Sequence, residues 1–267
     1  MDNRSIGIFD SGLGGLTVMK QIMEEFPREN IVYFGDTGRV PYGTRSKETI
    51  IKYSRGDIRF LESCDVKYII IACGTASSAA LPAICDEFKT PIIGVVDATA
   101  NAAVKMTKNK KIGVIGTNGT IKSGAYEAII EKHGIKTYSA ACPLFVPLVE
   151  NGHFETEVAR LVVKEYLEPI TKAGVDTLIL GCTHYPHLKK VIGEYMGEDV
   201  SLIDPGIELS KFLKENFASD MLHDETEDSE KYRYFVSDSP EGFEELASTF
   251  LERDVNGKVK KIDIEKY

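Results

Sequence analysis

Residues 68–75 read Tyr-Ile-Ile-Ile-Ala-Cys-Gly-Thr, and residues 177–184 read Thr-Leu-Ile-Leu-Gly-Cys-Thr-His. In both stretches an apolar, largely branched run ends at a cysteine, Cys73 or Cys182, and small polar residues follow. Near-continuous apolar runs of this length are typical of strands that are buried on both faces, as in parallel sheets. The two stretches therefore predict interior strands of a parallel α/β fold.

Each of these stretches follows a glycine-containing opening at a similar offset. Gly-Ile-Phe-Asp-Ser-Gly occupies residues 7–12, and Gly-Val-Ile-Gly-Thr-Asn-Gly occupies residues 113–119. The matching offsets predict two similar lobes that face each other. The alternative is that any two α/β units share a strand, a glycine turn and a helix because the fold requires them.

Outward from these stretches, short apolar segments alternate with amphipathic ones, which is typical of α/β proteins. Strands are predicted over residues 5–9, 30–34, 68–72, 92–96, 111–115, 136–141, 177–180 and 201–203. Helices are predicted over residues 16–25, 46–63, 76–88, 123–133, 154–172 and 207–216. The acidic residues 220–231 predict a mobile surface connection to a strand (232–236), a helix (241–251) and a last strand (259–264), which together pack onto one of the lobes.

Composition and charge narrow the function classes. With 43% hydrophobic and 27% charged residues among 267, the chain is typical of a globular protein with a sizeable core. A net charge of −9 argues against nucleic acid as a partner, and the lysines near residue 110 are interpreted as a solvated turn. We expect no membrane span, because the longest apolar runs have only the length of strands.

The cysteines predict a reducing compartment. There are five, at positions 64, 73, 85, 142 and 182, with no Cys-x-x-Cys pair. An odd number without paired spacing argues against a disulfide framework and against a structural zinc site. No signal peptide is recognisable before the first apolar segment, so we expect a cytoplasmic protein.

Polar residues gather where predicted strands end, which is where open α/β sheets bind ligands. They are Asp10, Ser11, Cys73, Thr75, Thr117, Cys182, Thr183 and His184. A single cysteine is most often a small buried filler, but two at matching places in a repeat indicate chemistry. We expect a helix N-terminus to lower the thiol pKa and favour the thiolate. A thiolate that removes a proton and a thiol that delivers one on the opposite face could together invert a stereocentre.

Several of these features have a second interpretation. Asp10 could assist Cys73 or only cap the helix that follows, and Glu150 could assist Cys182 or belong to a turn. The glycine-rich residues 12–15 lack the spacing of a nucleotide-binding loop, so their amides are better suited to a carboxylate. Cys182, His184 and His187 could suggest a metal, but without a supporting second cluster we predict none.

Six motifs make the chain similar to a known family. They lie at residues 9–16, 33–46, 72–77, 116–123, 142–150 and 181–186; the second reads Tyr-Phe-Gly-Asp-Thr-Gly-Arg-Val-Pro-Tyr-Gly-Thr-Arg-Ser and the last Gly-Cys-Thr-His-Tyr-Pro. On these motifs the chain resembles the glutamate racemases of the aspartate/glutamate racemase superfamily over residues 6–218. The resemblance implies two α/β lobes related by pseudo-twofold symmetry, with the active site in the cleft between them. We expect residues 1–97 and 208–267 to form the first lobe and residues 98–207 the second.

The resemblance also implies the chemistry and the site. Without a cofactor or metal, two bases would interconvert L- and D-glutamate and supply D-glutamate for peptidoglycan. The implied catalytic residues are Cys73, Cys182, Asp10, Glu150 and His184. The implied substrate contacts are Asp10, Ser11, Pro41, Tyr42, Gly43, Gly74, Thr75, Thr120, Thr183 and His184. A homodimer is implied as well, with no nucleic-acid or membrane partner. Because the first predicted strand begins near Ser5, we expect no activator requirement.

The chain departs from the family pattern at Gly74, where the family usually has asparagine. Losing an amide that binds substrate costs on the order of 1–3 kcal/mol, although the backbone amide remains and a water could fill the gap. This departure keeps two alternatives open. The substrate could be aspartate or another acidic amino acid, or the chain could bind glutamate without turning it over. Residues 97–100 also lack a common Pro-Gly, and His187 replaces an apolar residue.

Overall fold

The structure, a computed structural model, describes residues 2–217, 222 and 231–267. Its first sheet is parallel and has the strand order β10-β9-β2-β1-β3-β4. The strands are β1 (Ser5–Asp10), β2 (Ile31–Gly35), β3 (Val66–Ile71), β4 (Ile92–Gly94), β9 (Tyr232–Val236) and β10 (Val259–Lys261). All residues of β1 and β2 are buried, as their apolar sequences require for strands covered on both faces.

The second sheet is also parallel and has the order β6-β5-β7-β8. Its strands are β5 (Lys111–Gly116), β6 (Lys136–Ala141), β7 (Thr177–Leu180) and β8 (Ser201–Ile203). The order second-first-third-fourth is the same as that of β2-β1-β3-β4, so the two sheets repeat one unit. The predicted fold of two similar parallel α/β lobes is confirmed.

Helices cover both sheets and begin at side chains that suit a helix start. Ser46 and Thr156 cap α2 and α9 by accepting hydrogen bonds from the backbone three residues on, and Gly174 ends α9 in the left-handed conformation. The α-helices are α1 (Leu16–Glu25), α2 (Lys47–Ser63), α3 (Gly74–Ala79), α4 (Leu81–Ile84), α5 (Val95–Met106), α6 (Asn118–Ser123), α7 (Ala125–Ile130), α8 (Phe145–Glu150), α9 (Glu157–Ala173), α10 (Lys189–Met196), α11 (Pro205–Asn216) and α12 (Pro240–Leu251). Short 3₁₀ turns are η1 (Tyr42–Thr44), η2 (Cys85–Glu87), η3 (Glu131–His133), η4 (Tyr185–Leu188) and η6 (Ile264–Lys266).

The elements differ from prediction in several places, among them the last strand, expected over 259–264, which ends at Lys261. The strand expected over 92–96 ends at Gly94, and Val95 begins α5, a helix that the sequence did not predict. The helix expected over 76–88 is divided, because Pro82 cannot sit in a helix interior and instead starts α4. The short α6 and α8 and the helix α10 were not predicted either.

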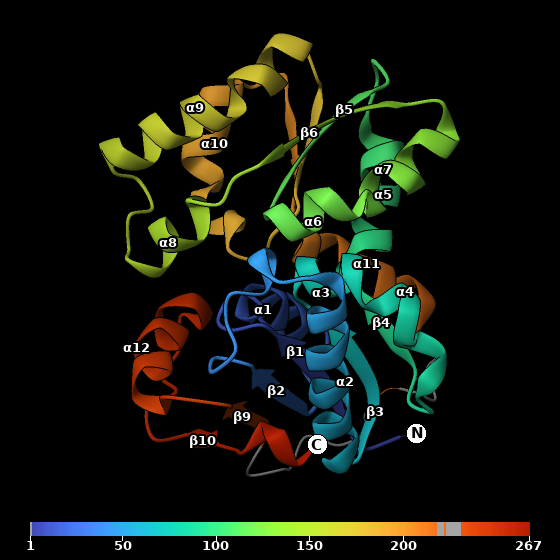
Figure 1. Ribbon diagram of the computed structural model, residues 1–267, viewed down its shortest axis with the longest axis vertical. Helices are drawn as coiled ribbons and strands as arrows, with labels where there is room; N and C mark the ends of the chain where they lie inside the picture. The colour runs from blue at the N-terminus through green and yellow to red at the C-terminus, as the bar shows by residue number, and fades with distance from the viewer. Residues whose placement is uncertain (1, 218–221, 223–230) are drawn as a thin grey trace.

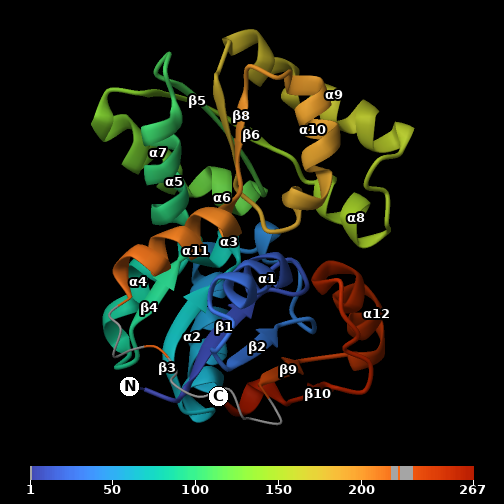
Figure 2. The same ribbon diagram turned by 180° about the vertical axis from the view of Figure 1, so that it is seen from behind.

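The two sheets lie one beyond the other along the long axis, with α3 and α6 between them (Figure 1). Helices α5 and α11 pack against each other at the junction, and the predicted lobe boundaries at 97/98 and 207/208 fall inside them (Figure 2). These boundaries stay a prediction.

Strands β9 and β10 join the first sheet next to β2. The connection predicted over 220–231 lies, except for Leu222 and Lys231, outside the described residues. Among the helices described, none is both long enough and apolar enough to cross a bilayer.

Candidate functional site

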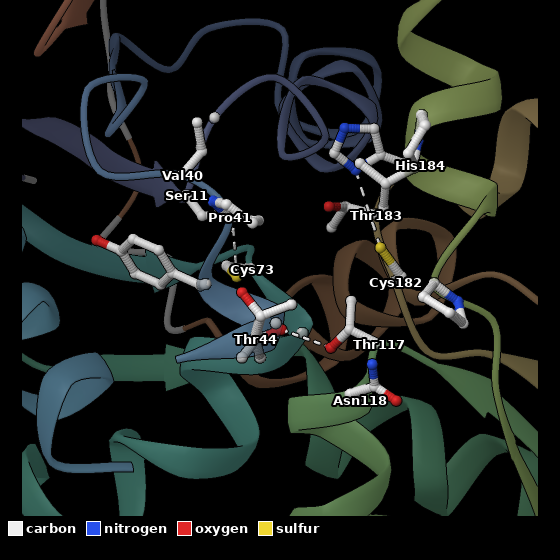
Figure 3. Close-up of a pocket in the computed structure, with 18 of the residues that line it drawn as sticks. Ser11, Val40, Pro41, Thr44, Cys73, Thr117, Asn118, Cys182, Thr183 and His184 are labelled. Atoms are coloured by element: carbon white, nitrogen blue, oxygen red, sulfur yellow. Dashed lines mark hydrogen bonds between the residues drawn. The ribbon is translucent and has the colours of Figure 1, made fainter. Parts of the chain in front are cut away.

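A cavity of about 310 Å³ opens between the lobes. Its wall comes from the segments that follow β1, β2 and β3 in the first lobe and β5, β6 and β7 in the second. Figure 3 shows the two contributions on opposite sides, with Ser11, Pro41 and Cys73 facing Thr117, Cys182 and His184. Because equivalent strand ends of a repeated unit meet here, the two cysteines come from equivalent positions, each after the third strand of its unit.

Cys73 caps the N-terminus of α3 and is 5% exposed. Its Sγ lies 3.5 Å from Ser11 Oγ and accepts a hydrogen bond from the Ala76 amide, also at 3.5 Å. Burial, joined by the negative charge of Asp10, raises the pKa of Cys73 to about 12. The expected lowering of this pKa is wrong, because burial outweighs the hydrogen bonds from Ser11 and the short helix. Cys73 is therefore a neutral thiol at neutral pH.

Asp10 lies behind the cavity wall rather than in it. Its carboxyl accepts a hydrogen bond from the Gly12 amide at 2.9 Å and from Thr183 Oγ1, in the other lobe, at 3.2 Å. Burial raises the pKa of Asp10, against the opposing effects of the His184 charge and these hydrogen bonds. Asp10 thus holds the turn after β1 and ties it to Thr183, and its charge acts on Cys73.

Cys182 is 7% exposed and has a different partner. Its Sγ lies 3.8 Å from Nδ1 of His184, and Nε2 of the same ring lies 3.1 Å from Glu150 Oε1. Burial by itself lowers the pKa of His184, but hydrogen bonds to Cys182 and Glu150, with the charges of Cys182 and Asp10, outweigh it and raise the pKa to about 10. The ring is therefore an imidazolium at neutral pH. The half-exposed Glu150, at the end of α8, completes a line of three groups.

His187 does not join this line. Its ring stacks on Phe154 with centroids 5.5 Å apart and contacts Phe250 of α12 at 4.0 Å. Burial and the charge of His184 lower the pKa of His187 to about 4, so the ring is neutral. Cys182, His184 and His187 are therefore not arranged as three ligands of one metal; among the residues described, no group of three or more metal-binding side chains was found.

Tyr42 lines the cavity, but its hydroxyl points to a buried network in the first lobe. Tyr42 Oη hydrogen-bonds to Asp36 and, at 2.9 Å, to Asp57, while Arg39 donates to both carboxyls at 2.7 Å. Burial and the charge of Asp36 raise the pKa of Asp57 well above its usual range, and the charge of Arg39 opposes them. The network holds the loop 39–44, whose backbone forms one side of the cavity.

Most predicted site residues line the cavity. They are Ser11, Pro41, Tyr42, Gly43, Cys73, Gly74, Thr75, Glu150, Cys182, Thr183 and His184. Asp10 and Thr120 lie just behind the wall, with Thr120 Oγ1 3.1 Å from Oγ1 of the lining residue Thr117. At Gly74 the position of an added Cβ is 2.5 Å from the carbonyl oxygen of Gly181, so backbone fills the gap in which a water was expected.

Eight further lining residues were not among the implied catalytic residues and substrate contacts. They are Gly12, Val40, Thr44, Thr117, Asn118, Pro143, Val146 and Pro147. Of these, Thr117 was named at a predicted strand end and Gly12 in the glycine-rich loop, whereas Asn118, which follows β5 as Ser11 follows β1, could have been found from the repeat. The apolar residues of α8 gave no such signal, because their sequence is as typical of a helix packed in a core as of a helix that lines a cavity.

Comparisons with known proteins agree with this geometry. Residues 6–211 match the protein family described as Asp/Glu/Hydantoin racemase. A glutamate racemase from Geobacter metallireducens is 46% identical over 250 residues, which cover 93% of each chain, and one from Persephonella marina is 46% identical over 98% of each chain. The crystal structure of glutamate racemase from Francisella tularensis in complex with D-glutamate superimposes with a TM-score of 0.90, at 39% identity and over the full length of both chains.

Proposed function

The chain belongs to the Asp/Glu/hydantoin racemase family and is an amino-acid racemase, and from this premise we propose that it interconverts L- and D-glutamate with Cys73 and Cys182 as opposed acid and base. Glutamate is proposed because relatives that match nearly the whole chain are glutamate racemases. One observation carries the two-cysteine part. Two buried cysteines from equivalent strand ends face one cavity from opposite lobes.

The partners of the two thiols suggest their starting roles. The His184 imidazolium lies 3.8 Å from Cys182 Sγ, so we assign to Cys182 the role of the group that takes the proton. Cys73, with its raised pKa and the nearby Asp10, holds its proton. The pocket therefore starts with a base on one side and an acid on the other.

In the proposed step, the Cys182 thiolate takes the Cα proton from one face of the substrate, and the C–H electron pair remains on the substrate as a carbanionic centre. The Cys73 thiol then gives its proton to the opposite face. The charge has moved from Cys182 to Cys73, so the product state is ready for the reverse reaction. Before a second turnover in the same direction, Cys182 must return its proton to water and Cys73 must take one up, and His184 with Glu150, and Asp10, set the charge beside each sulfur.

The Cα proton of an amino acid is a very weak acid, so the site must stabilise the negative charge that develops. We propose that backbone amides do this. Those of Gly74 and Thr75 open α3 and have no acceptor within the helix. Amides at Ser11, Gly43 and Thr183 belong to the same wall, and the side-chain hydroxyls of Thr75 and Thr117 meet across it at 2.8 Å. A substrate that fills the cavity would displace water from it, which strengthens each of these contacts.

The proposal extends to the role of the product and to assembly. D-glutamate would be supplied for peptidoglycan in a bacterial cytoplasm, and the chain would act as a homodimer without a cofactor. The family resemblance supports these points. Val40 and Leu144, 44% and 49% exposed near the cavity, provide apolar surface that an association could cover.

Single substitutions of the two cysteines test the mechanism. We expect Cys73→Ala and Cys182→Ala each to lower racemisation by at least about 10³-fold, while Cys85→Ala, at an exposed position, leaves it unchanged. In heavy water each active-site variant should still exchange the α-proton of one enantiomer only, the one whose Cα–H faces the remaining cysteine. Circular dichroism follows racemisation, and proton NMR follows exchange.

The same measurements separate the alternatives. Racemisation within threefold of wild type in either variant contradicts the two-base mechanism. Faster turnover of L-aspartate than of L-glutamate by the wild type contradicts the choice of substrate. Tight glutamate binding without exchange at Cα in the wild type identifies a binding protein instead.

A further inference from the structure

At Gly74 the backbones of the two lobes come close together beside the cysteines. A Cβ built on Gly74 would lie 2.5 Å from the carbonyl oxygen of Gly181, the residue before Cys182. A Cβ of any residue essentially never comes so close to a backbone oxygen, and the clashing atom is not a flexible side-chain end. Gly74 follows Cys73 directly, so this contact joins the two residues next to the proposed acid and base.

Neither side of this contact is free to move alone. In the first lobe, the Ala72 amide donates to Phe9 at 2.9 Å and the Ser77 amide to Cys73 at 2.8 Å. In the second lobe, the Gly181 amide donates to Ile115 at 2.7 Å, and a Cβ at Gly181 would lie 2.6 Å from the same Ile115 oxygen. Gly74 is thus held by the first sheet and Gly181 by the second. A side chain at position 74 must be relieved by moving the lobes apart.

Other contacts around the cavity also require the two lobes to lie this close together. Added Cβ atoms at Gly43 and Gly119 would lie 2.7 Å from Thr117 Cβ and 2.9 Å from Thr75 Cγ2, each across the lobe junction. Thr75 and Thr117 share a hydrogen bond of 2.8 Å. A shift of the lobes that relieved a clash at Gly74 would lengthen this bond between two residues of the cavity wall.

We propose that Gly74 is a positioning residue: its missing side chain lets the lobes close until Cys73 and Cys182 are spaced for proton transfer to opposite faces of one carbon. This inference rests on the proposed two-cysteine function. On this inference the glycine at position 74 acts by letting the lobes approach each other, which is a different effect from the loss of a substrate contact. An asparagine at this position would bring its Cβ against the Gly181 carbonyl as the lobes stand in this structure.

The test is Gly74→Ala, which adds a single methyl group. Gly74 is the first residue of α3, where alanine favours a helix more than glycine does, and this offsets part of the cost of the clash, so the chain should stay folded with a modestly lower melting temperature. We expect kcat for glutamate to fall by about 10²-fold, because a displacement on the order of 1 Å from productive geometry has an effect of that size. KM should change much less. The matched control is Gly242→Ala in α12, where an added Cβ meets nothing within 4 Å, and wild-type kinetics are expected.

A second readout does not need turnover. Iodoacetamide labelling, followed by peptide mass spectrometry, reports access to each cysteine, with the exposed Cys85 as internal reference. Opening the junction should speed labelling of the buried Cys73 and Cys182 at least fivefold in Gly74→Ala and not in Gly242→Ala. Lost activity without faster labelling, faster labelling with wild-type kcat, or no change in either would overturn the inference. If the wild type does not racemise glutamate, the proposed function fails, and labelling still decides whether Gly74 sets the junction.

Discussion

The Cys73 and Cys182 half-sites have the same place in the repeated unit and opposite electrostatic surroundings. Each cysteine follows the third strand of its sheet and is almost fully buried. Cys73 faces a hydroxyl, a helix amide and the carboxyl of Asp10, whereas Cys182 faces the imidazolium of His184. The repeat thus accounts for where the sulfurs are, and the neighbours account for their charge. Two-base chemistry requires both, because two identical half-sites would start with either two acids or two bases.

The largest effect on this difference between the two half-sites is expected when the positive charge beside Cys182 is removed. In His184→Asn the amide can still donate near Cys182 Sγ but carries no charge, so we expect kcat to fall by about 10²-fold. The deuterium isotope effect should rise for the enantiomer whose α-proton Cys182 removes, since that step becomes limiting. The control is His133→Asn, at an exposed position at the end of η3. A kcat within threefold of wild type would show that the imidazolium is not needed.

A second, smaller effect is expected on stability, because His184 and His187 have pKa values shifted in opposite directions. The pKa of folded His184 is about 10 against an ordinary 6.5, so its stabilisation is complete below pH 6.5 and is lost as the pH rises through 10. The pKa of folded His187 is about 4, so stability falls as the pH drops below 6.5 towards 4. In the proposed charge state an unfolded Cys182 gains a proton as His184 loses one, so the decrease is measured in Cys182→Ala, where the free energy of unfolding should fall as the pH rises from 6.5 to 8.5.

Urea unfolding at pH 5.5, 6.5 and 8.5 measures these slopes. Below pH 9.0, the ordinary pKa of a thiol, ionisation of unfolded cysteines contributes little. In the Cys182→Ala background, His184→Asn should lose most of the decrease between pH 6.5 and 8.5, and His187→Asn should lose part of the decrease below 6.5. If the free energy of unfolding of His184→Asn changes with pH above 6.5 as it does without this substitution, another group holds the proton assigned to this ring.

The sequence could predict features that follow from local patterns, but not features that depend on contacts between distant segments. Strands β6, β7 and β8 have the predicted bounds, and β7 is predicted most directly, because a fully buried parallel strand is a local pattern of apolar residues. The strand-end residues, both cysteines among them, were predicted because strand ends converge in this fold, whereas lining residues such as Pro41, Tyr42 and Gly43 were predicted from the family resemblance. Helix α5 was missed because Val95 and Val96 continue an apolar run that is typical of a strand.

What the sequence could not predict depends on contacts between distant segments. A cysteine at a helix start predicts a lowered pKa, but the burial that raises the pKa of Cys73 comes from the closed lobes. The Gly181 carbonyl beside Gly74 is a contact over more than a hundred residues. Position 42 was expected to contact substrate, and the sequence could not show that the Tyr42 hydroxyl instead meets Asp57.

The smallest expected effect concerns that hydroxyl, and it sharpens the comparison because only the Cys73 half-site has such a support. In Tyr42→Phe, Asp36 and Asp57 keep Arg39 but lose the hydroxyl between them, which should reduce the free energy of unfolding by roughly 1–3 kcal/mol. The loop 39–44 should then hold the cavity wall less firmly, lowering kcat/KM for glutamate by three- to tenfold.

The matched control is Tyr138→Phe in β6 of the second lobe, whose ring contacts Lys136 with the ammonium 5.0 Å from the ring centre. It should leave both quantities within experimental error of wild type. If Tyr42→Phe loses stability but keeps kcat/KM, the buried network stabilises the first lobe without positioning the cavity wall. The asymmetry of the site would then lie only in the immediate neighbours of the two sulfurs.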